Sequence, residues 1–331
     1  MELISDDHPL LIFVGSGGVG KTTLAAATGV LSAESGRDTL VMTFDPSLRL
    51  KDALGVGEEA REHEVGVDLS PLAGDGRDSR GRLDASLLDA KRTFDRLIER
   101  YAPDPESRRR ILENRFYNQL SGSLGGILEY MAVERLFEVA ASGRYAQVVL
   151  DTPPTRQALD FLEAPARIVG FLDSGALRVG LKSWFDEEGR LKASRGVLGR
   201  LGRRAERFLD DVVGLDLLRD MSEFFQAFSP LYAGFHERAE AVEALLRSPK
   251  TLFVLVSGPG EERIPDTLFF ARRLKAAGYP LGPIVVNRVH PDFTPDFGEV
   301  VGAPFDPSQP GKVDGHRLLA WLGERDRRGH A

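Results

Sequence analysis

The stretch Leu10-Leu-Ile-Phe-Val-Gly-Ser-Gly-Gly-Val-Gly-Lys-Thr-Thr23 decides the fold of this 331-residue chain. Its first five residues form an unbroken apolar run, as expected of a strand buried on both faces of a parallel sheet. Leu24, Ala27, Thr28 and Leu31 then recur at i, i+3, i+4 and i+7, which predicts a helix over 22–35 packed on that sheet. The order strand, glycine-rich loop, helix indicates a doubly wound, mostly parallel α/β domain.

The glycine-rich turn between that strand and helix fits the phosphate-loop (P-loop) pattern G-x-x-x-x-G-K-[ST]. Its glycines permit φ values that a Cβ would penalise and let backbone N–H groups reach phosphate oxygens. Lys21 would neutralise the β and γ phosphates of a nucleotide and Thr22 would place its hydroxyl on Mg²⁺, beside the positive end of the helix dipole. The alternative is a glycine-rich turn without a ligand. The predicted nucleotide-binding residues are Gly15, Ser16, Gly17, Gly18, Val19, Gly20, Lys21, Thr22 and Thr23.

Two further strand-like runs, 39–44 and 147–150, each end in an aspartate, Asp45 and Asp151. Open parallel sheets bind ligands at the carboxyl ends of their strands, so both carboxylates would emerge beside the phosphates. There Asp45 would orient an attacking water and Asp151 would hold Mg²⁺, directly or through water. The alternative is that each aspartate only ends its strand in a turn.

The apolar runs 252–256 and 282–286 predict two more buried strands. Asn287 follows the second run, and its side-chain amide offers one donor and one acceptor, which matches the edge of adenine. Asn287 is therefore the candidate purine contact, with a turn-forming asparagine as the alternative.

Taken together and in this order, these four motifs resemble the ArsA family of the MinD-related P-loop NTPases. That family holds the arsenite-pump-driving ATPases and the ATPase that targets tail-anchored membrane proteins. The resemblance covers residues 10 to about 305 and implies ATP and Mg²⁺ as cofactors and a dimer that closes on ATP and opens after hydrolysis. It implies the catalytic residues Lys21, Asp45 and Asp151 and the metal-binding residues Thr22, Asp45 and Asp151. It also implies the cofactor-binding residues Asn287, Arg288, Pro304 and Phe305, with Asn287 reading adenine and Pro304-Phe305 in the loop that covers the base.

The chain departs from the family pattern at Ser16, where the family carries a second lysine that reaches the partner's phosphates. A neutral hydroxyl cannot stabilise the charge that develops during phosphoryl transfer. Three arrangements remain open: a slow homodimer, an arginine such as Arg49 or Arg156 acting instead, or a heterodimer with a lysine-bearing paralogue. The resemblance therefore implies an ATPase switch, with a low-turnover ATP-binding scaffold or regulatory subunit as the alternative.

The chain has no cysteine, which excludes a thiolate site for arsenite or zinc in this sequence. It carries 43 basic and 50 acidic residues, so a general nucleic-acid binder is not expected. The longest apolar runs fall short of the roughly 20 residues of a membrane span, and we expect a cytoplasmic protein.

Residues 158–247 contain no strand-like run and are expected to form a helical, partner-binding insert within a single ATPase domain spanning 1–331. A helix over 196–213 carries arginines at i, i+3, i+4 and i+7, which suits an anionic membrane, an acidic partner or simply solvent. The expected partners are a second ATPase subunit and a client protein. Helices are also expected over 83–101, 106–120 and 127–142.

Overall fold

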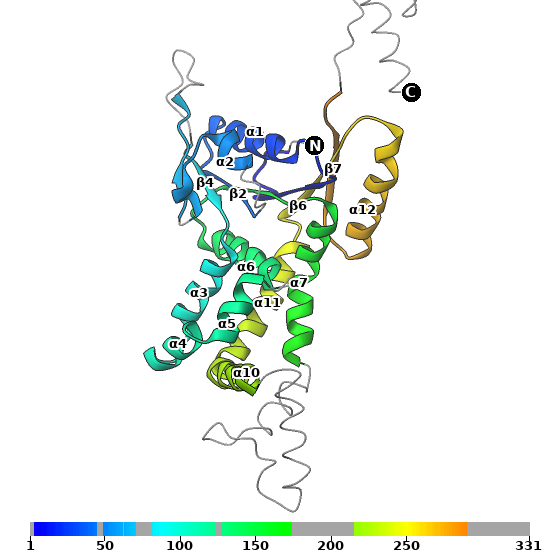
Figure 1. The fold of residues 1–331 in the computed structure, drawn as a ribbon. Coiled ribbons are helices and arrows are strands. Elements are labelled where there is room, and N and C mark those ends of the chain that lie inside the picture. Colours follow the sequence, from blue (N-terminus) through cyan, green and yellow to red (C-terminus); the bar gives the residue numbers. More distant parts are fainter. Residues whose placement is uncertain are drawn as a thin grey trace, which may run out of the picture.

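The structure, a computed structural model, describes residues 3–44, 49–61, 63–70, 81–123, 127–173 and 215–289 (Figure 1). These residues form one seven-stranded sheet in the order β3-β4-β2-β5-β1-β6-β7. All paired strands run parallel except β3 and β4, which confirms the mostly parallel α/β fold. The strands are β1 (Leu10–Gly15), β2 (Thr39–Thr43), β3 (Val65–Gly66), β4 (Leu83–Leu87), β5 (Gln147–Asp151), β6 (Thr251–Ser257) and β7 (Leu281–Val286).

Helices cover both faces of the sheet, as the continuous apolar strands require. One face packs on α1 and α2 through side chains such as Leu11, Phe13 and Val254. The other face packs on α6, α7, α11 and α12 through side chains such as Leu10 and Ile12. The helices are α1 (Lys21–Glu34), α2 (Arg49–Leu54), α3 (Ala90–Tyr101), α4 (Pro105–Leu112), α5 (Arg115–Ser123), α6 (Ile127–Ser142), α7 (Thr155–Asp173), α10 (Leu215–Phe228), α11 (Tyr232–Arg247) and α12 (Ile264–Ala276).

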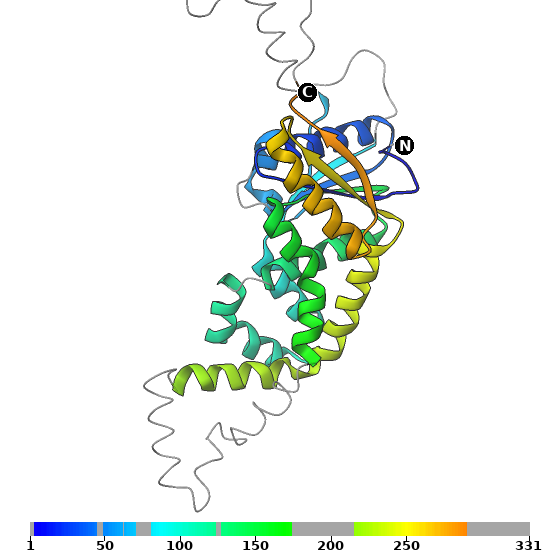
Figure 2. The same cartoon turned by 90° about the vertical axis from the view of Figure 1, so that its right-hand side faces the viewer.

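A helical body extends away from the sheet, and α7 and α11 run from the sheet toward α10 at its far end (Figure 2). Its core is rich in aromatic rings, with Phe94 packed edge-on against Tyr117 and Phe228. Helices α3 to α6 contribute to this core together with α7, α10 and α11. Two separate segments of the chain therefore build the helical body, whereas the sequence suggested only 158–247. None of the described helices has the length and apolarity needed to cross a bilayer.

The sequence-based expectation of a helix beginning at Leu83 is wrong. Leu83–Leu87 is strand β4, and the helix begins only at Ala90. Leu83, Ala85 and Leu87 join the core between the sheet and α1, while Asp84 accepts a hydrogen bond from the Tyr145 hydroxyl at 2.7 Å. This alternation has the period of two that a strand requires, but the helical spacing that begins at Leu87 concealed it.

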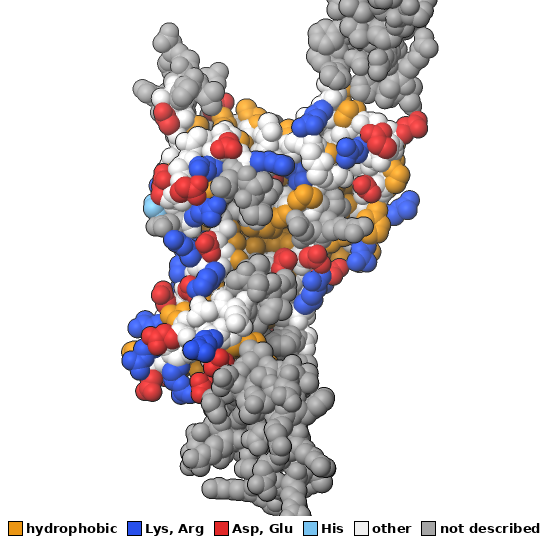
Figure 3. Space-filling model, in the orientation of Figure 1, with side chains coloured by type: hydrophobic (Ala, Val, Ile, Leu, Met, Phe, Trp, Pro, Cys, Tyr) orange, Lys and Arg blue, Asp and Glu red, His pale blue; other side chains and the backbone are white. Residues whose placement is uncertain are grey.

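The predicted helix 196–213, with its arginine-rich face, lies outside the described residues. On the described face in Figure 3, lysine and arginine side chains are interspersed with aspartate and glutamate.

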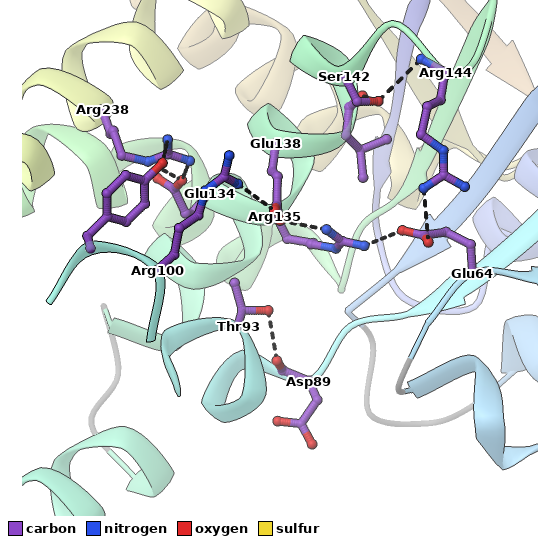
Figure 4. Close-up of polar contacts among 12 residues, drawn as sticks. Glu64, Asp89, Thr93, Arg100, Glu134, Arg135, Glu138, Ser142, Arg144 and Arg238 are labelled. Carbon is purple, nitrogen blue, oxygen red and sulfur yellow. Dashed lines mark hydrogen bonds and ion pairs between the residues drawn. The ribbon is translucent and has the colours of Figure 1, made fainter. Parts of the chain in front are cut away.

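A buried ion pair fastens the helical body together at Glu134 of α6 (Figure 4). The Glu134 side chain is only 1% exposed and accepts a hydrogen bond of 2.6 Å from Nε of Arg238 on α11. Arg238 also donates to the Tyr101 hydroxyl at the end of α3, and the buried Tyr130 hydroxyl donates to Glu134. Burial, with the adjoining Glu134 carboxylate, raises the pKa of Tyr130, so this hydroxyl remains a donor. The cluster thus joins α3, α6 and α11.

A second ion-pair cluster joins α6 to the sheet side of the molecule. Arg135 pairs with Glu64, which precedes β3, and with Glu138 one turn further along α6 (Figure 4). Arg144 also reaches Glu64, at 3.5 Å. Helix α6 therefore links the helical body to the strand layer.

We expect Glu134→Gln to lower the free energy of unfolding by about 3 kcal/mol, because the change leaves the half-buried Arg238 guanidinium without its counter-charge. Guanidinium chloride titration followed by circular dichroism measures this loss.

The matched control is Glu243→Gln on α11, where a partly exposed i,i+4 pair with Arg247 should contribute about 0.5 kcal/mol at most. Equal losses in the two variants would contradict the role given to the buried pair.

Candidate functional site

The P-loop joins β1 to α1 at the carboxyl edge of the sheet. Gly15 has a φ of +150°, and a Cβ there would lie 2.1 Å from the Val256 carbonyl oxygen of β6. Gly20 has a φ of +91° and precedes α1, and a Cβ there would lie 2.4 Å from Nδ2 of Asn287. Both positions therefore require glycine, one because of the neighbouring strand and one because of the turn into the helix.

Lys21 lies folded into this loop and is only 7% exposed. Its Nζ donates to the carbonyl oxygens of Gly15 and Ser16, at 3.0 Å each. The ammonium therefore sits at the loop's first two residues, close to the positive N-terminal end of α1. Such an arrangement can bind an anion, because the lysine can exchange loop carbonyls for phosphate oxygens.

Thr22 and Asp151 meet at the end of β5. The Thr22 hydroxyl donates to Oδ2 of Asp151 at 2.7 Å, and the Thr43 hydroxyl at the end of β2 donates to the same oxygen at 3.3 Å. Asp151 is 1% exposed, and the parallel register sets it opposite Phe13 of β1 and Thr43 of β2. The alignment of three strands thus brings these hydroxyl and carboxylate oxygens to one point.

These oxygens fit a magnesium ion. Mg²⁺ takes oxygen ligands and is usually held by one or two carboxylates together with substrate phosphates and waters. Thr22 and Asp151 would supply the protein's share. Among the described residues, no cluster of three or more acidic or histidine side chains offers an all-protein metal cage.

The loop after β5 packs against the P-loop. Both the N–H and the hydroxyl of Thr152 donate to the carbonyl oxygen of Phe13, at 3.3 and 2.7 Å. A Cβ added to Gly17 would lie 3.9 Å from the side chain of Pro154. Helix α7 begins at the next residue, so its start is tied to the strand that carries the P-loop.

Asp45 lies outside the described residues, but Phe44 immediately before it is described. The Phe44 ring stacks on Phe161 of α7 with ring centroids 4.5 Å apart. The segment that leads into Asp45 therefore contacts α7 directly. Sequence reasoning missed this contact, and it missed Thr43, whose only signal was its place at the end of a strand.

The structure brings Asn287 to the P-loop. Its Nδ2 donates to the Val19 carbonyl oxygen at 2.9 Å, and its backbone N–H donates to Ser257 at the end of β6. Contact of Asn287 with a purine stays a prediction. Arg288 is exposed with a φ of +64°, and Pro304 and Phe305 lie outside the described residues.

An open groove of about 860 Å³ begins at Ser16 and Gly17 of the P-loop and runs between α7 and α12. It is lined by charged side chains of both signs together with Leu159 and Phe269, and sequence reasoning did not find it. The charged residues along it are Asp160, Glu163, Arg263, Asp266 and Arg273.

Comparison with known proteins agrees with this geometry. The family model for anion-transporting ATPases, ArsA_ATPase, matches residues 8–176, which contain the P-loop, Asp45 and Asp151. A putative arsenical pump-driving ATPase 1 of Aquifex aeolicus is 24% identical over 86% of this chain and 64% of its own length. A putative arsenical pump-driving ATPase of Halobacterium salinarum is 32% identical over 51% of this chain and 26% of its own.

The ATPase get3 of Aspergillus terreus is 32% identical over 46% of this chain and 42% of its own length. In each of these comparisons the match spans less than two thirds of the relative. The match to the family model covers half of the chain and includes its phosphate-binding loop and both strand-end aspartates. The chain therefore belongs to the ArsA family of anion-transporting ATPases.

Proposed function

We propose that this protein is a Mg-ATP-dependent ATPase that acts as a dimeric switch and couples hydrolysis to a partner protein or an envelope-associated process. The observation that carries the proposal is the convergence of Lys21, Thr22 and Asp151 at the tips of β1 and β5. An ammonium, a hydroxyl and a carboxylate at the N-terminus of a helix are the groups that a magnesium triphosphate needs.

Each residue of the proposed site has a defined task in the reaction. Lys21 exchanges the carbonyls of Gly15 and Ser16 for β- and γ-phosphate oxygens. Thr22 and Asp151 hold Mg²⁺, which neutralises charge on the phosphates when it is bound. Asp45 orients the attacking water.

Helix α7 is the proposed route from the nucleotide to the partner. It begins four residues after Asp151, and its Phe161 stacks on Phe44, next to Asp45. Its second half packs in the helical body through Ala164 and Ile168. A shift of either aspartate-bearing loop would therefore move α7 against α6 and α11, which is how a nucleotide switch transmits its state.

The proposed partners are a second ATPase subunit, either identical or paralogous, and a client protein bound by the helical insert within 158–247. We place the protein in the cytoplasm, with peripheral membrane contact through residues 196–213 and no nucleic-acid partner. Because this sequence has no cysteine, arsenite binding by thiolates is not part of the proposal, although relatives carry the arsenical pump name.

Ser16 supports a second candidate function. It lies at the edge of the phosphate site, where Lys21 alone of the described P-loop residues carries a positive charge. A site with one cation binds ATP but hydrolyses it slowly. The protein would then be an ATP-binding scaffold or the regulatory subunit of a heterodimer with a lysine-bearing paralogue.

Lys21→Ala should weaken ATP binding about 100-fold and abolish hydrolysis, because the site loses its charge-assisted hydrogen bonds to phosphate. Isothermal titration and phosphate release measure the two effects. Lys91→Ala, which removes an exposed lysine paired with Asp95 in the helical body, is the control and should change neither. Unchanged ATP affinity in Lys21→Ala would show that the anion site is assigned wrongly.

Asp45→Asn should lower kcat by about 10²–10⁴ and leave the ATP dissociation constant within about threefold, because the water loses its orienting carboxylate while the phosphate contacts remain. The same variant, held in the ATP state, should retain its partner during purification from native cells. Mass spectrometry of the retained proteins then separates a homodimer from a heterodimer and identifies the client. A full rate of hydrolysis in Asp45→Asn would remove this residue from the mechanism.

If the missing cation limits the rate, Ser16→Lys should raise the turnover of the purified protein at least about tenfold. Steady-state phosphate release with the wild type run in parallel measures it. An unchanged rate would count against the missing-lysine explanation. Turnover of the wild type near background, with tight ATP binding, would favour the scaffold.

A further inference from the structure

The groove beside the P-loop brings an arginine to the edge of the phosphate site. Arg263, in the short 3-10 turn Glu261–Arg263 that precedes α12, lines the same groove as Ser16 and Gly17. Gly258 lies between the two regions: a Cβ on it would be 3.8 Å from Cγ1 of Val19 and 3.9 Å from Cγ of Arg263. The stem of Arg263 and Val19 of the P-loop therefore flank the same residue, Gly258.

The position of Lys21 shows which end of the bound nucleotide would face this groove. The P-loop lysine reaches the β and γ phosphates, and here its Nζ lies on the carbonyls of Gly15 and Ser16. The γ-phosphate would thus lie at the Ser16 end of the loop. That end is the one that opens into the groove.

The backbone of Arg263 is fixed relative to the P-loop. Its N–H donates to Gly260, and its carbonyl oxygen accepts from the Thr267 hydroxyl at 2.7 Å. That hydroxyl is 2.8 Å from the hydroxyl of Ser257, the last residue of β6. Since β6 pairs with β1 up to Gly15, one continuous set of contacts sets the distance from Arg263 to the loop.

The guanidinium of Arg263 is available for an anion. Its side chain is 42% exposed, and its ion pair with Glu262 is long, at 3.8 Å, with the glutamate 73% exposed. Such an exposed pair contributes little and yields readily to a phosphate. The other arginine that lines the groove, Arg273, pairs with Glu163 at 3.2 Å and lies further along α12.

We propose that Arg263 contacts the γ-phosphate of bound ATP from the groove and stabilises the charge that develops on it during hydrolysis. This inference rests on the proposed ATPase function and adds one residue to it. The water oxygen bonds to the γ-phosphorus while the bond from that phosphorus to the bridging oxygen breaks, its electron pair leaving with ADP. The protons of the water pass to the phosphate product and to solvent, and Arg263 keeps its own proton throughout.

Three variants test the role of Arg263: Arg263→Ala, Arg263→Lys and, as the control, Arg273→Ala in the same groove. Three quantities are measured on the full chain: kcat, the dissociation constant of ATP, and the affinity for Mg-ADP with aluminium fluoride, which mimics the transferring phosphoryl group. The last readout does not depend on turnover.

Arg263→Ala should lower kcat by about 10²–10³-fold and weaken ADP–aluminium fluoride binding by a similar factor, with ATP affinity changed less than about fivefold. The kcat and the ADP–aluminium fluoride affinity of Arg263→Lys should lie between those of the wild type and Arg263→Ala. Lysine keeps the positive charge but lacks the planar guanidinium that donates two parallel hydrogen bonds. Arg273→Ala should match the wild type. Circular dichroism confirms that each variant is folded.

Wild-type kcat and wild-type aluminium fluoride affinity in Arg263→Ala would overturn the role of Arg263 and leave the proposed ATPase function standing. An equal loss of ATP and transition-state-analogue affinity would also overturn it, since the residue would then serve binding alone. Failure of the wild type to bind ATP would instead overturn the proposed function, and this inference with it. If the wild type binds ATP but hydrolyses it too slowly to measure, the aluminium fluoride affinities still decide the role of Arg263.

Discussion

The hydrogen bond from Thr22 to Asp151 joins the start of α1 to the end of β5, and the candidate site is arranged around it. It forms because β1, β2 and β5 run parallel in register, so that their carboxyl ends meet at one edge of the sheet. A shift of β5 by one residue would turn Asp151 to the opposite face. The buried strands that hold this register are therefore as much a part of the candidate site as the residues that would face a nucleotide.

The same edge connects the site to the rest of the molecule. Thr152 holds the loop after β5 against β1, and α7 leaves that loop and continues into the helical body. Phe161 on α7 stacks on Phe44, so the residue that precedes Asp45 and the loop that follows Asp151 both contact this helix. Helix α7 is 19 residues long and runs from the loop after β5 into the aromatic core of the helical body, as the proposed route from nucleotide to partner requires.

The charged clusters on α6 fix the surface on which α7 packs. Glu134 with Arg238 joins three helices of the body, and Arg135 with Glu64 joins α6 to the strand layer. Burying such a pair costs desolvation energy, and removing one partner leaves an uncompensated charge, so the two partners must stay together in the folded protein. In this protein their geometry keeps α6 in place beside α7 and α11.

The sequence by itself determined the α/β class, the P-loop with Lys21 and Thr22, and Asp151 at the end of a buried strand, because each of these is a local pattern of a few adjacent residues. The local pattern also led to a wrong prediction of helix at Leu83–Leu87, because helical spacing further along the chain concealed the alternation of a strand. Only the tertiary structure decided what depends on contacts between distant segments. Asn287 donates to the Val19 carbonyl, Phe44 stacks on Phe161, Glu134 meets Arg238, and Arg263 shares a groove with Ser16. The physical reason is that periodicity records which face of an element is buried, whereas the neighbour across that face is set by strand order and by the packing of whole helices.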